Sequence, residues 1–202
     1  MSGSEPILPQ RATPDAVTIT SVEWLFEPYW PGERLMARMQ DGRVTLTDAA
    51  AQPAGSEFAQ VGGLLEAAID ADAAVIDGIW TSQPFVDGSA SRPTFVAIDL
   101  VELDGQSLAR VPYQERRRLL ASVLQESRGV RITPAVRVPA QPWLEAWRRQ
   151  GFTRYVAKHA NSRYRPGEQV QDWLVVSAGS GGKPSPGGRL GRSRVKRRRI
   201  ED

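Results

Sequence analysis

The sequence predicts an α+β domain built mainly from antiparallel sheets with flanking helices. Segments rich in β-branched and aromatic residues are separated by short turn signals, and three other segments carry apolar residues at a spacing of three and four. The two kinds of segment interleave without the regular strand–helix–strand alternation of a parallel sheet. Hydrophobic residues make up 41% of the 202-residue chain and charged residues 24%, which is typical of a soluble globular domain.

The expected strands follow from their content of Val, Ile, Thr and aromatic residues. In chain order they cover residues 16–20, 23–27, 35–40, 43–47, 74–77, 94–103, 130–138, 155–158 and 173–176. Between the third and the fourth strand, Asp41-Gly42 is a strong short-range signal for a hairpin turn. Before the first strand, residues 1–15 are polar and contain prolines, so we expect a loose N-terminal lead-in.

Three helices are expected, and each has a boundary signal. Ser56 is a candidate N-cap for a helix that continues to residue 68. Pro112 lies where a second helix begins, and residues 113–126 follow it. A third helix over residues 143–150 is expected to end at Gly151.

These elements place one compact domain at residues 16–177. Residues 178–188 are rich in Gly, Ser and Pro and predict a flexible linker, and residues 189–202 predict a disordered basic tail. Residues 183–202 contain eight basic and two acidic residues, whereas the rest of the chain contains 18 basic and 21 acidic residues. A slightly acidic body therefore carries a cationic arm.

The composition argues against several kinds of chemistry. The chain has no cysteine, so it can form neither a disulfide framework nor a thiolate metal site, and its single histidine, His159, argues against a Ser–His triad.

We expect no membrane partner, because no apolar run approaches the roughly 20 residues of a spanning helix. Residues 1–11 carry no signal-peptide pattern, and the arginine-rich, lysine-poor composition indicates a GC-rich genome. We expect a cytoplasmic, nucleoid-associated protein of a bacterium.

Three stretches carry a more specific pattern. The first is W-L-F-E-P-Y-W-P-G-E-R at residues 24–34. The second is F-V-A-I-D-L at 95–100, followed by L-D-G at 103–105. The third is Y-V-A-K at 155–158, followed by S-R-Y-R-P-G at 162–167. Their order and spacing resemble the motifs of the adenylation domain of ATP-dependent DNA ligases, which include W-L-F-E-x-K-W-D-G-x-R and E-G-V-V-A-K.

The resemblance covers roughly residues 22–177 and implies a fold and a chemistry. The implied fold is the ATP-grasp-like nucleotidyltransferase core of DNA ligases, here with no OB-fold domain expected after Ser177. The implied setting is DNA repair and recombination. In the family, a lysine of the first motif attacks the α-phosphate of ATP and holds AMP as a phosphoramide, and Mg²⁺ assists.

This sequence departs from the family at the positions that do the chemistry. They are occupied by Tyr29 at the nucleophilic lysine, Ile79 at the ribose-binding glutamate, Ile98 at the adenine-stacking phenylalanine, Thr153 at the metal-binding glutamate, and Val175 and Ser177 at two phosphate-neutralising lysines. A phenol can in principle be adenylylated, but we interpret Tyr29 as a side chain that fills space left by the nucleotide. Arg34 and Lys158 match family cations and are candidates for residual phosphate contacts, with an ion-paired structural role as the alternative.

The basic tail is a candidate nucleic-acid contact. Its cationic residues are Lys183, Arg189, Arg192, Arg194, Lys196, Arg197, Arg198 and Arg199. A cationic arm can bind DNA through phosphates and counterion release, without sequence specificity. The alternative is a tail that only aids solubility.

The sequence therefore predicts a catalytically inactive, DNA-associated accessory factor in repair, with no cofactor, no metal and a repair protein as a further partner. Two other functions stay open. One is a divergent but active ATP-dependent ligase or nucleotidyltransferase that uses ATP and Mg²⁺, with Tyr29 or Lys158 as an unusual acceptor. The other is a protein–protein adaptor whose former ATP cleft binds a peptide. A contiguous apolar groove lined by Tyr29, Ile79, Ile98 and Val175 would favour the adaptor.

Overall fold

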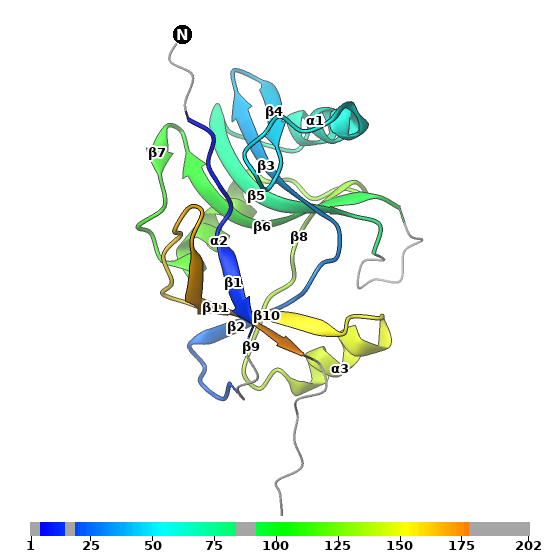
Figure 1. Cartoon of the computed structure of the whole chain (residues 1–202), viewed down its shortest axis with the longest axis vertical. Helices are drawn as coiled ribbons and strands as arrows, with labels where there is room; N and C mark the ends of the chain where they lie inside the picture. Colours follow the sequence, from blue (N-terminus) through cyan, green and yellow to red (C-terminus); the bar gives the residue numbers. More distant parts are fainter. Residues whose placement is uncertain (1–4, 15–18, 84–91, 178–202) are drawn as a thin grey trace, which may run out of the picture.

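Two β-sheets form the scaffold of the computed structural model, which describes residues 5–14, 19–83 and 92–177 (Figure 1). The larger sheet contains, in spatial order, β4 (Arg43–Thr47), β3 (Glu33–Gln40), β5 (Ala73–Thr81), β6 (Thr94–Leu103) and β7 (Gln106–Ser107). These strands are antiparallel, and β8 (Val130–Ile132) pairs with β6 in parallel. The turn between β3 and β4 is the predicted hairpin, because Asp41 and Gly42 both adopt positive φ angles.

The smaller sheet lies below the larger one in Figure 1. Its spatial order is β1 (Arg11–Pro14), β11 (Gln169–Ser177), β10 (Arg154–His159), β2 (Trp24–Pro28) and β9 (Val136–Arg137). All its pairs are antiparallel except β1 with β11. The mainly antiparallel α+β fold that the sequence predicted is thus confirmed.

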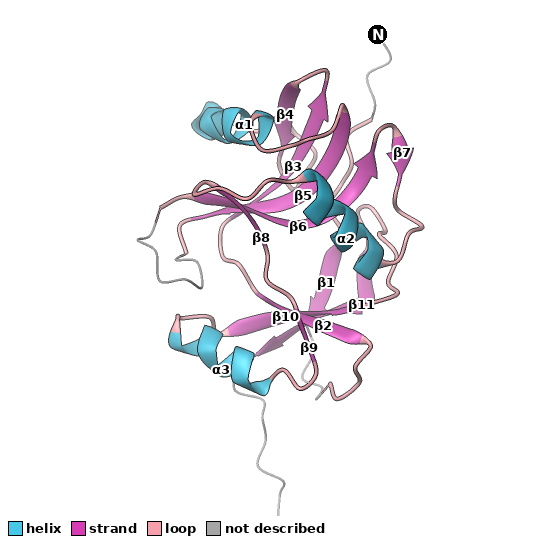
Figure 2. Cartoon of the chain, turned by 180° about the vertical axis from the view of Figure 1, so that it is seen from behind, coloured by secondary structure: helices cyan, strands magenta, loops and turns pink. Residues whose placement is uncertain are grey.

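Helices cover the outer faces of the sheets (Figure 2). A short 3-10 helix (Ser56–Phe58) leads into α1 (Ala59–Glu66), and α2 (Tyr113–Val123) and α3 (Gln141–Arg149) follow. The helices α1 and α2 share one core with the larger sheet, and α3 packs against the smaller one. None of the helices in the described part of the chain has the length and apolar composition needed to cross a membrane.

Strand alternation decides which residues of β6 face the smaller sheet. Phe95 and Ala97 belong to the core under α1 and α2, whereas Val96 and Ile98 belong to a second core shared with the smaller sheet. This is the period of two that a strand imposes on its side chains. It turns Ile98 toward the space between the sheets.

Four sequence predictions need correction. The supposed lead-in contains β1, which pairs with a strand more than 150 residues away. The predicted strand over 130–138 is two strands, β8 and β9, and each belongs to a different sheet. Ser56 does not cap a helix, because the 3-10 helix has Gly55 at its N-cap and α1 has Phe58. Of the strand expected at 16–20, residues 19 and 20 are not in a strand and the remainder lies outside the described residues.

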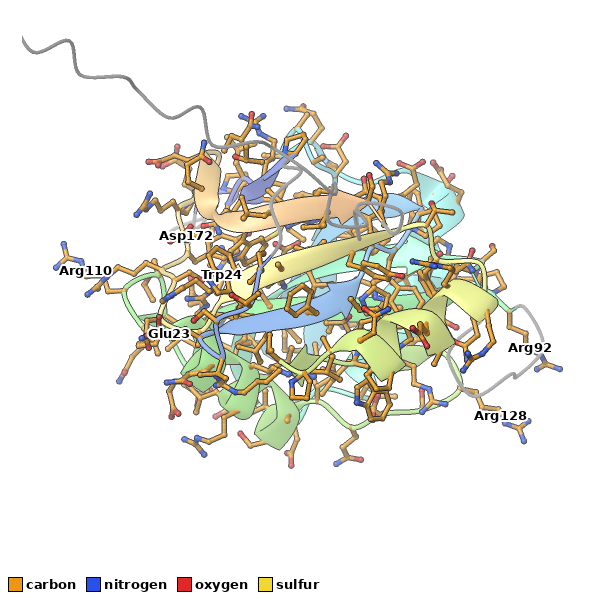
Figure 3. All side chains as sticks on the ribbon, turned by 90° about the horizontal axis from the view of Figure 1, so that it is seen from below. Glu23, Trp24, Arg92, Arg110, Arg128 and Asp172 are labelled. Carbon is orange, nitrogen blue, oxygen red and sulfur yellow. The ribbon has the colours of Figure 1, made fainter. Side chains whose placement is uncertain are left out.

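Charged side chains surround the two sheets. Figure 3 shows Arg92 and Arg128 projecting at one end of the molecule and Arg110 at the opposite end. The labelled surface arginines are therefore dispersed and do not form one face.

Candidate functional site

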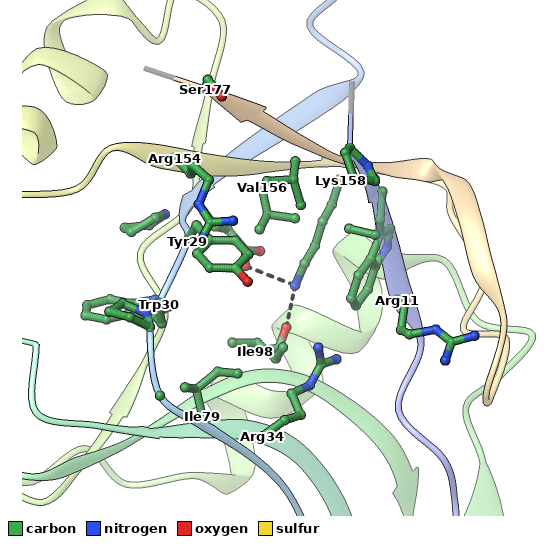
Figure 4. A pocket seen from close by; sticks show the side chains of 18 residues that line it. Arg11, Tyr29, Trp30, Arg34, Ile79, Ile98, Arg154, Val156, Lys158 and Ser177 are labelled. Atoms are coloured by element: carbon green, nitrogen blue, oxygen red, sulfur yellow. Dashed lines mark hydrogen bonds and ion pairs between the residues drawn. The ribbon is translucent and has the colours of Figure 1, made fainter. Parts of the chain in front are cut away.

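A cleft of about 1000 Å³ lies between the two sheets (Figure 4). The larger sheet contributes Arg34, Ile79 and Ile98. The smaller sheet and its loops contribute the rest of the wall, namely Arg11, Ala12, Pro14, Glu27, Pro28, Tyr29, Trp30, Pro31, Gly32, Arg154, Val156, Lys158, Trp173, Val175 and Ser177. The three motif-bearing stretches of the sequence therefore meet at one site.

A tight turn carries the chain from one sheet to the other beside the cleft. Gly32 lies between β2 and β3 with a φ of 143°. A Cβ atom there would lie 2.2 Å from the carbonyl oxygen of Trp80. Only glycine fits this turn, so the glycine of the first motif has a structural reason of its own.

Lys158 is buried at the base of the cleft. Its Nζ lies 2.9 Å from Glu27 Oε2 and donates a hydrogen bond of 2.8 Å to the carbonyl oxygen of Ile98. The same atom lies 4.1 Å from the ring centre of Trp173. Burial lowers the pKa of Lys158, and the carboxylate of Glu27 opposes that shift. The amine thus ties β10 and β2 of the smaller sheet to β6 of the larger one.

Arg34 is held in a second ion pair. Its Nε and Nη2 donate to the two carboxylate oxygens of Asp77, each at 2.6 Å. The hydroxyl of Tyr164 donates to the same carboxylate at 2.8 Å. The structure therefore gives both family-matched cations, Arg34 and Lys158, an ion-paired role. A phosphate contact by either remains a prediction of the sequence.

Tyr29 follows β2 directly and lies beneath an arginine. Its backbone N–H donates to the carbonyl oxygen of Arg154 at 3.1 Å, and the guanidinium carbon of Arg154 lies 3.9 Å from the centre of the Tyr29 ring. This is a stacking distance for a cation over an aromatic face. The side chain of Tyr29 is half-buried, and that of Arg154 is exposed.

The remaining predicted positions divide between the cleft and its surroundings. Ile79, Ile98, Val175 and Ser177 line the cleft together with Tyr29. Thr153 does not line it, and instead lies in a small adjoining hollow of about 60 Å³. The candidate residues of the tail, from Lys183 to Arg199, lie outside the described residues.

Two features of the cleft were missed from the sequence. One is Arg11, which lines the cleft because β1 pairs with β11, a long-range pairing with no local signal. The other is the partnership of Glu27 with Lys158 and with the hydroxyl of Tyr113, which donates to Glu27 Oε1. The pairing of the two charges could have been suspected, since buried charges need partners.

The lining fits a magnesium nucleotide poorly. Glu27 is the only carboxylate in the wall of the cleft, and it is engaged by Lys158 and Tyr113. Among the described residues, no group of three or more His, Cys, Asp or Glu side chains is placed to hold a metal ion. Mg²⁺ prefers oxygen ligands in near-ideal octahedral geometry.

Comparison with known proteins shows which proteins this chain is similar to. A sequence model of the ATP dependent DNA ligase domain matches residues 81–176. The multifunctional non-homologous end joining DNA repair protein LigD of Mycobacterium tuberculosis is 29% identical over 178 residues, which is 83% of this chain and 23% of that protein. DNA ligase C1 of Mycolicibacterium smegmatis is 26% identical over 195 residues, which is 82% of this chain and 54% of that protein.

Solved structures agree with the sequence relatives. The ligase domain of M. tuberculosis LigD superposes with a TM-score of 0.71 and 26% identity, over 86% of this chain and 60% of that one. A mycobacterial DNA ligase D complexed with ATP and MES gives a TM-score of 0.69 and 28% identity, with the same coverage. The chain thus spans about a quarter of the LigD proteins and 60% of these ligase-domain structures.

Two facing sheets with a cleft between them, lined by these motifs, define a nucleotidyltransferase-type core domain. The chain contains an adenylation-type core domain that is similar to that of ATP-dependent DNA ligases. The resemblance predicted from the three sequence stretches is confirmed.

Proposed function

We propose that this domain is a non-catalytic member of the ligase family that acts as a DNA-associated accessory factor in repair. Two observations carry the proposal. Tyr29, at the position where the resemblance implies a nucleophilic lysine, is stacked against Arg154. Lys158, the only lysine of the described residues, is engaged by Glu27 and by the carbonyl oxygen of Ile98.

The chemistry of adenylyl transfer supports inactivity. It needs a free nucleophile, a metal held by carboxylates and cations that stabilise the charge developing on phosphorus. The amine of Lys158 is buried and ion-paired, and the single carboxylate of the cleft is already occupied. Removing one stabilising group of this kind lowers the rate by about 10²–10³-fold in well-studied enzymes. Several are replaced here, so we expect neither ATP nor Mg²⁺ to be used.

The setting of the proposal comes from the relatives. Proteins of the LigD type are described as acting in non-homologous end joining DNA repair. We propose the same process for this chain, in the bacterial cytoplasm and at the nucleoid. DNA contact through the basic residues between Lys183 and Arg199 would supply the association, and a repair protein is the expected further partner.

Label transfer from α-labelled ATP tests the loss of catalysis. The full chain is incubated with the nucleotide and Mg²⁺ and then run on a denaturing gel, with the M. tuberculosis LigD ligase domain as the positive control. We expect no label on this chain. A covalent adenylate at any residue would overturn the proposal and favour the divergent active enzyme, with Tyr29 or Lys158 as the acceptor.

A second candidate, the protein–protein adaptor, has one observation in its favour. The four residues named for an apolar groove, Tyr29, Ile79, Ile98 and Val175, do line the same cleft. The half-buried Val175 is a suitable site for a charged substitution. If a repair partner binds there, Val175→Arg will abolish its binding while Arg149→Gln, on the outer helix α3, leaves it intact.

A further inference from the structure

The cations of the cleft are arranged along a line and not gathered at one point. Arg11 pairs with Gln169 at the start of β11, and Arg154 pairs with Ser177 at its end. The nine residues of β11 span at most about 26 Å at roughly 3.3 Å per residue. Figure 4 shows Arg11 and Arg154 on opposite sides of the cleft, with Lys158 and Arg34 between them.

The two central cations are neutralised, and the two at the ends are not. Lys158 is paired with Glu27, and Arg34 with Asp77. Within residues 5–14, 19–83 and 92–177, no carboxylate forms an ion pair with Arg11 or Arg154. Arg11 donates one hydrogen bond, of 3.1 Å, to the carbonyl oxygen of Gly167. A ligand with at least two separated negative charges fits this pattern better than a single phosphate group.

Arg154 also provides a flat surface. Tyr29 covers one face of its guanidinium group at 3.9 Å, and the arginine is exposed. Guanidinium planes and aromatic rings are the surfaces on which proteins stack unpaired bases. The apolar side chains of Pro31, Ile79 and Val175 complete the wall of the same cleft. Stacking and separated charges together are the recognition chemistry of a single nucleic-acid strand.

We propose that this cleft binds a short unpaired segment of DNA along β11, with one base stacked on Arg154 and a phosphate held by Arg11. The choice of DNA rests on the proposed repair function. The cleft has a volume of about 1000 Å³, and we infer that an unpaired strand enters it. The chain leaves the described structure at Ser177, at the Arg154 end, and seven basic residues follow between positions 189 and 199.

Fluorescence anisotropy with the full chain and a short labelled oligothymidylate tests the proposal. Arg154→Gln should weaken binding by about 5- to 150-fold, the range measured when one stacking side chain is removed. Arg154→Lys keeps the charge but loses the plane, so we expect a substantial loss there as well. Arg11→Gln should weaken binding and reduce its dependence on salt. The matched control is Arg149→Gln, which removes an exposed charge on α3 and should change the affinity less than about twofold.

Each other outcome would overturn the inference. If Arg154→Gln and Arg149→Gln lose the same amount of affinity, the oligonucleotide is attracted by net charge alone. If Arg154→Lys binds with wild-type affinity, no base is stacked on the guanidinium plane. If free dTMP competes at the same concentration as the oligonucleotide, the cleft is a mononucleotide subsite. Binding of an acidic peptide without any oligonucleotide binding would assign the cleft to a protein partner. None of these results depends on ATP labelling, so this inference and the proposed inactivity fail separately.

Discussion

Single residues of the cleft show that motif residues can stabilise the scaffold independently of any chemistry. Asp77 and Glu27 are fully buried, and each faces a cation of the motif-bearing stretches, Arg34 or Lys158. Burying an unpaired charge is expensive, so loss of either partner would leave the other uncompensated. These cations are therefore needed for stability whether or not a phosphate ever reaches them.

Restoring the lysine should not restore the chemistry. We expect Tyr29→Lys to remain unlabelled by α-labelled ATP in the presence of Mg²⁺, because Glu27, the only carboxylate of the cleft wall, stays bound to Lys158 and Tyr113. The measurement is the gel assay described above, with the folded state of the variant checked by circular dichroism. Efficient labelling of the variant would show that the lysine alone had been limiting.

The buried pair of Arg116 and Asp99 gives a sharper test of residue-level energetics. Arg116 donates to both carboxylate oxygens of Asp99, at 2.8 and 2.7 Å, and both side chains are fully buried. Asp99→Ala should lower the free energy of unfolding by about 3–5 kcal/mol, because the guanidinium remains buried without its partner.

The matched control for that substitution lies on the same strand. Glu102 pairs with Arg38 at 3.4 Å, and both side chains are about one-fifth exposed. Glu102→Ala should lower the free energy of unfolding by only about 0–1 kcal/mol. Urea unfolding measures both. Equal effects of the two substitutions would contradict this ranking by burial.

At the scale of elements, the sequence predicted correctly the turn, strand and helix start that depend on neighbouring residues. Asp41 and Gly42 form the expected hairpin turn, and the strand Thr94–Leu103 has the predicted bounds. The helix after Pro112 begins as expected at Tyr113 and ends at Val123, three residues early. The strand β1 escaped prediction because its pairing partner is far away in sequence, and short polar segments become strands only when an edge is available.

Two glycines should respond to the same substitution with opposite signs. A Cβ atom on Gly78 in β5 would meet the ring of the fully buried Phe95 at 2.2 Å, so Gly78→Ala should lower the free energy of unfolding by about 1–3 kcal/mol or more. Gly63 is exposed on α1 and has no atom within 4 Å of such a Cβ, so Gly63→Ala should raise it by about 0.5–1 kcal/mol. Urea unfolding of the two variants measures both changes, and a destabilised Gly63→Ala would refute the second.

For the whole molecule, the sequence predicted which residues would share a cleft but not which carboxylates would pair with the cations of that cleft. Tyr29, Ile79, Ile98, Val175 and Ser177 converge as the family resemblance implied. The pairing of Lys158 with Glu27 and the arrival of β1 depend on how the two sheets meet. The way in which the two sheets meet cannot be predicted from short stretches of neighbouring residues.

Two buried phenols also join the sheets, and they make the stability of the fold depend on pH. Tyr113, on α2, donates to Glu27 of the smaller sheet, and Tyr164, in the loop before β11, donates at 2.8 Å to Asp77 of the larger sheet. Burial raises the pKa of both phenols well above 10, and the adjacent carboxylates raise it further. The native state therefore retains protons that the unfolded chain releases near pH 10.

The sign of the effect follows from this linkage. The stability contributed by the two neutral phenols is fully present below pH 10 and is lost as the pH rises through their folded-state pKa values. We expect urea-unfolding free energies to fall above pH 10, and the phenolate absorbance of Tyr113 and Tyr164 to appear together with unfolding. The double variant Tyr113→Phe, Tyr164→Phe should be less stable at pH 7, because two buried carboxylates each lose a donor, but its stability should fall less steeply above pH 10. An alkaline decline as steep as that of the unsubstituted chain would show that other groups control it.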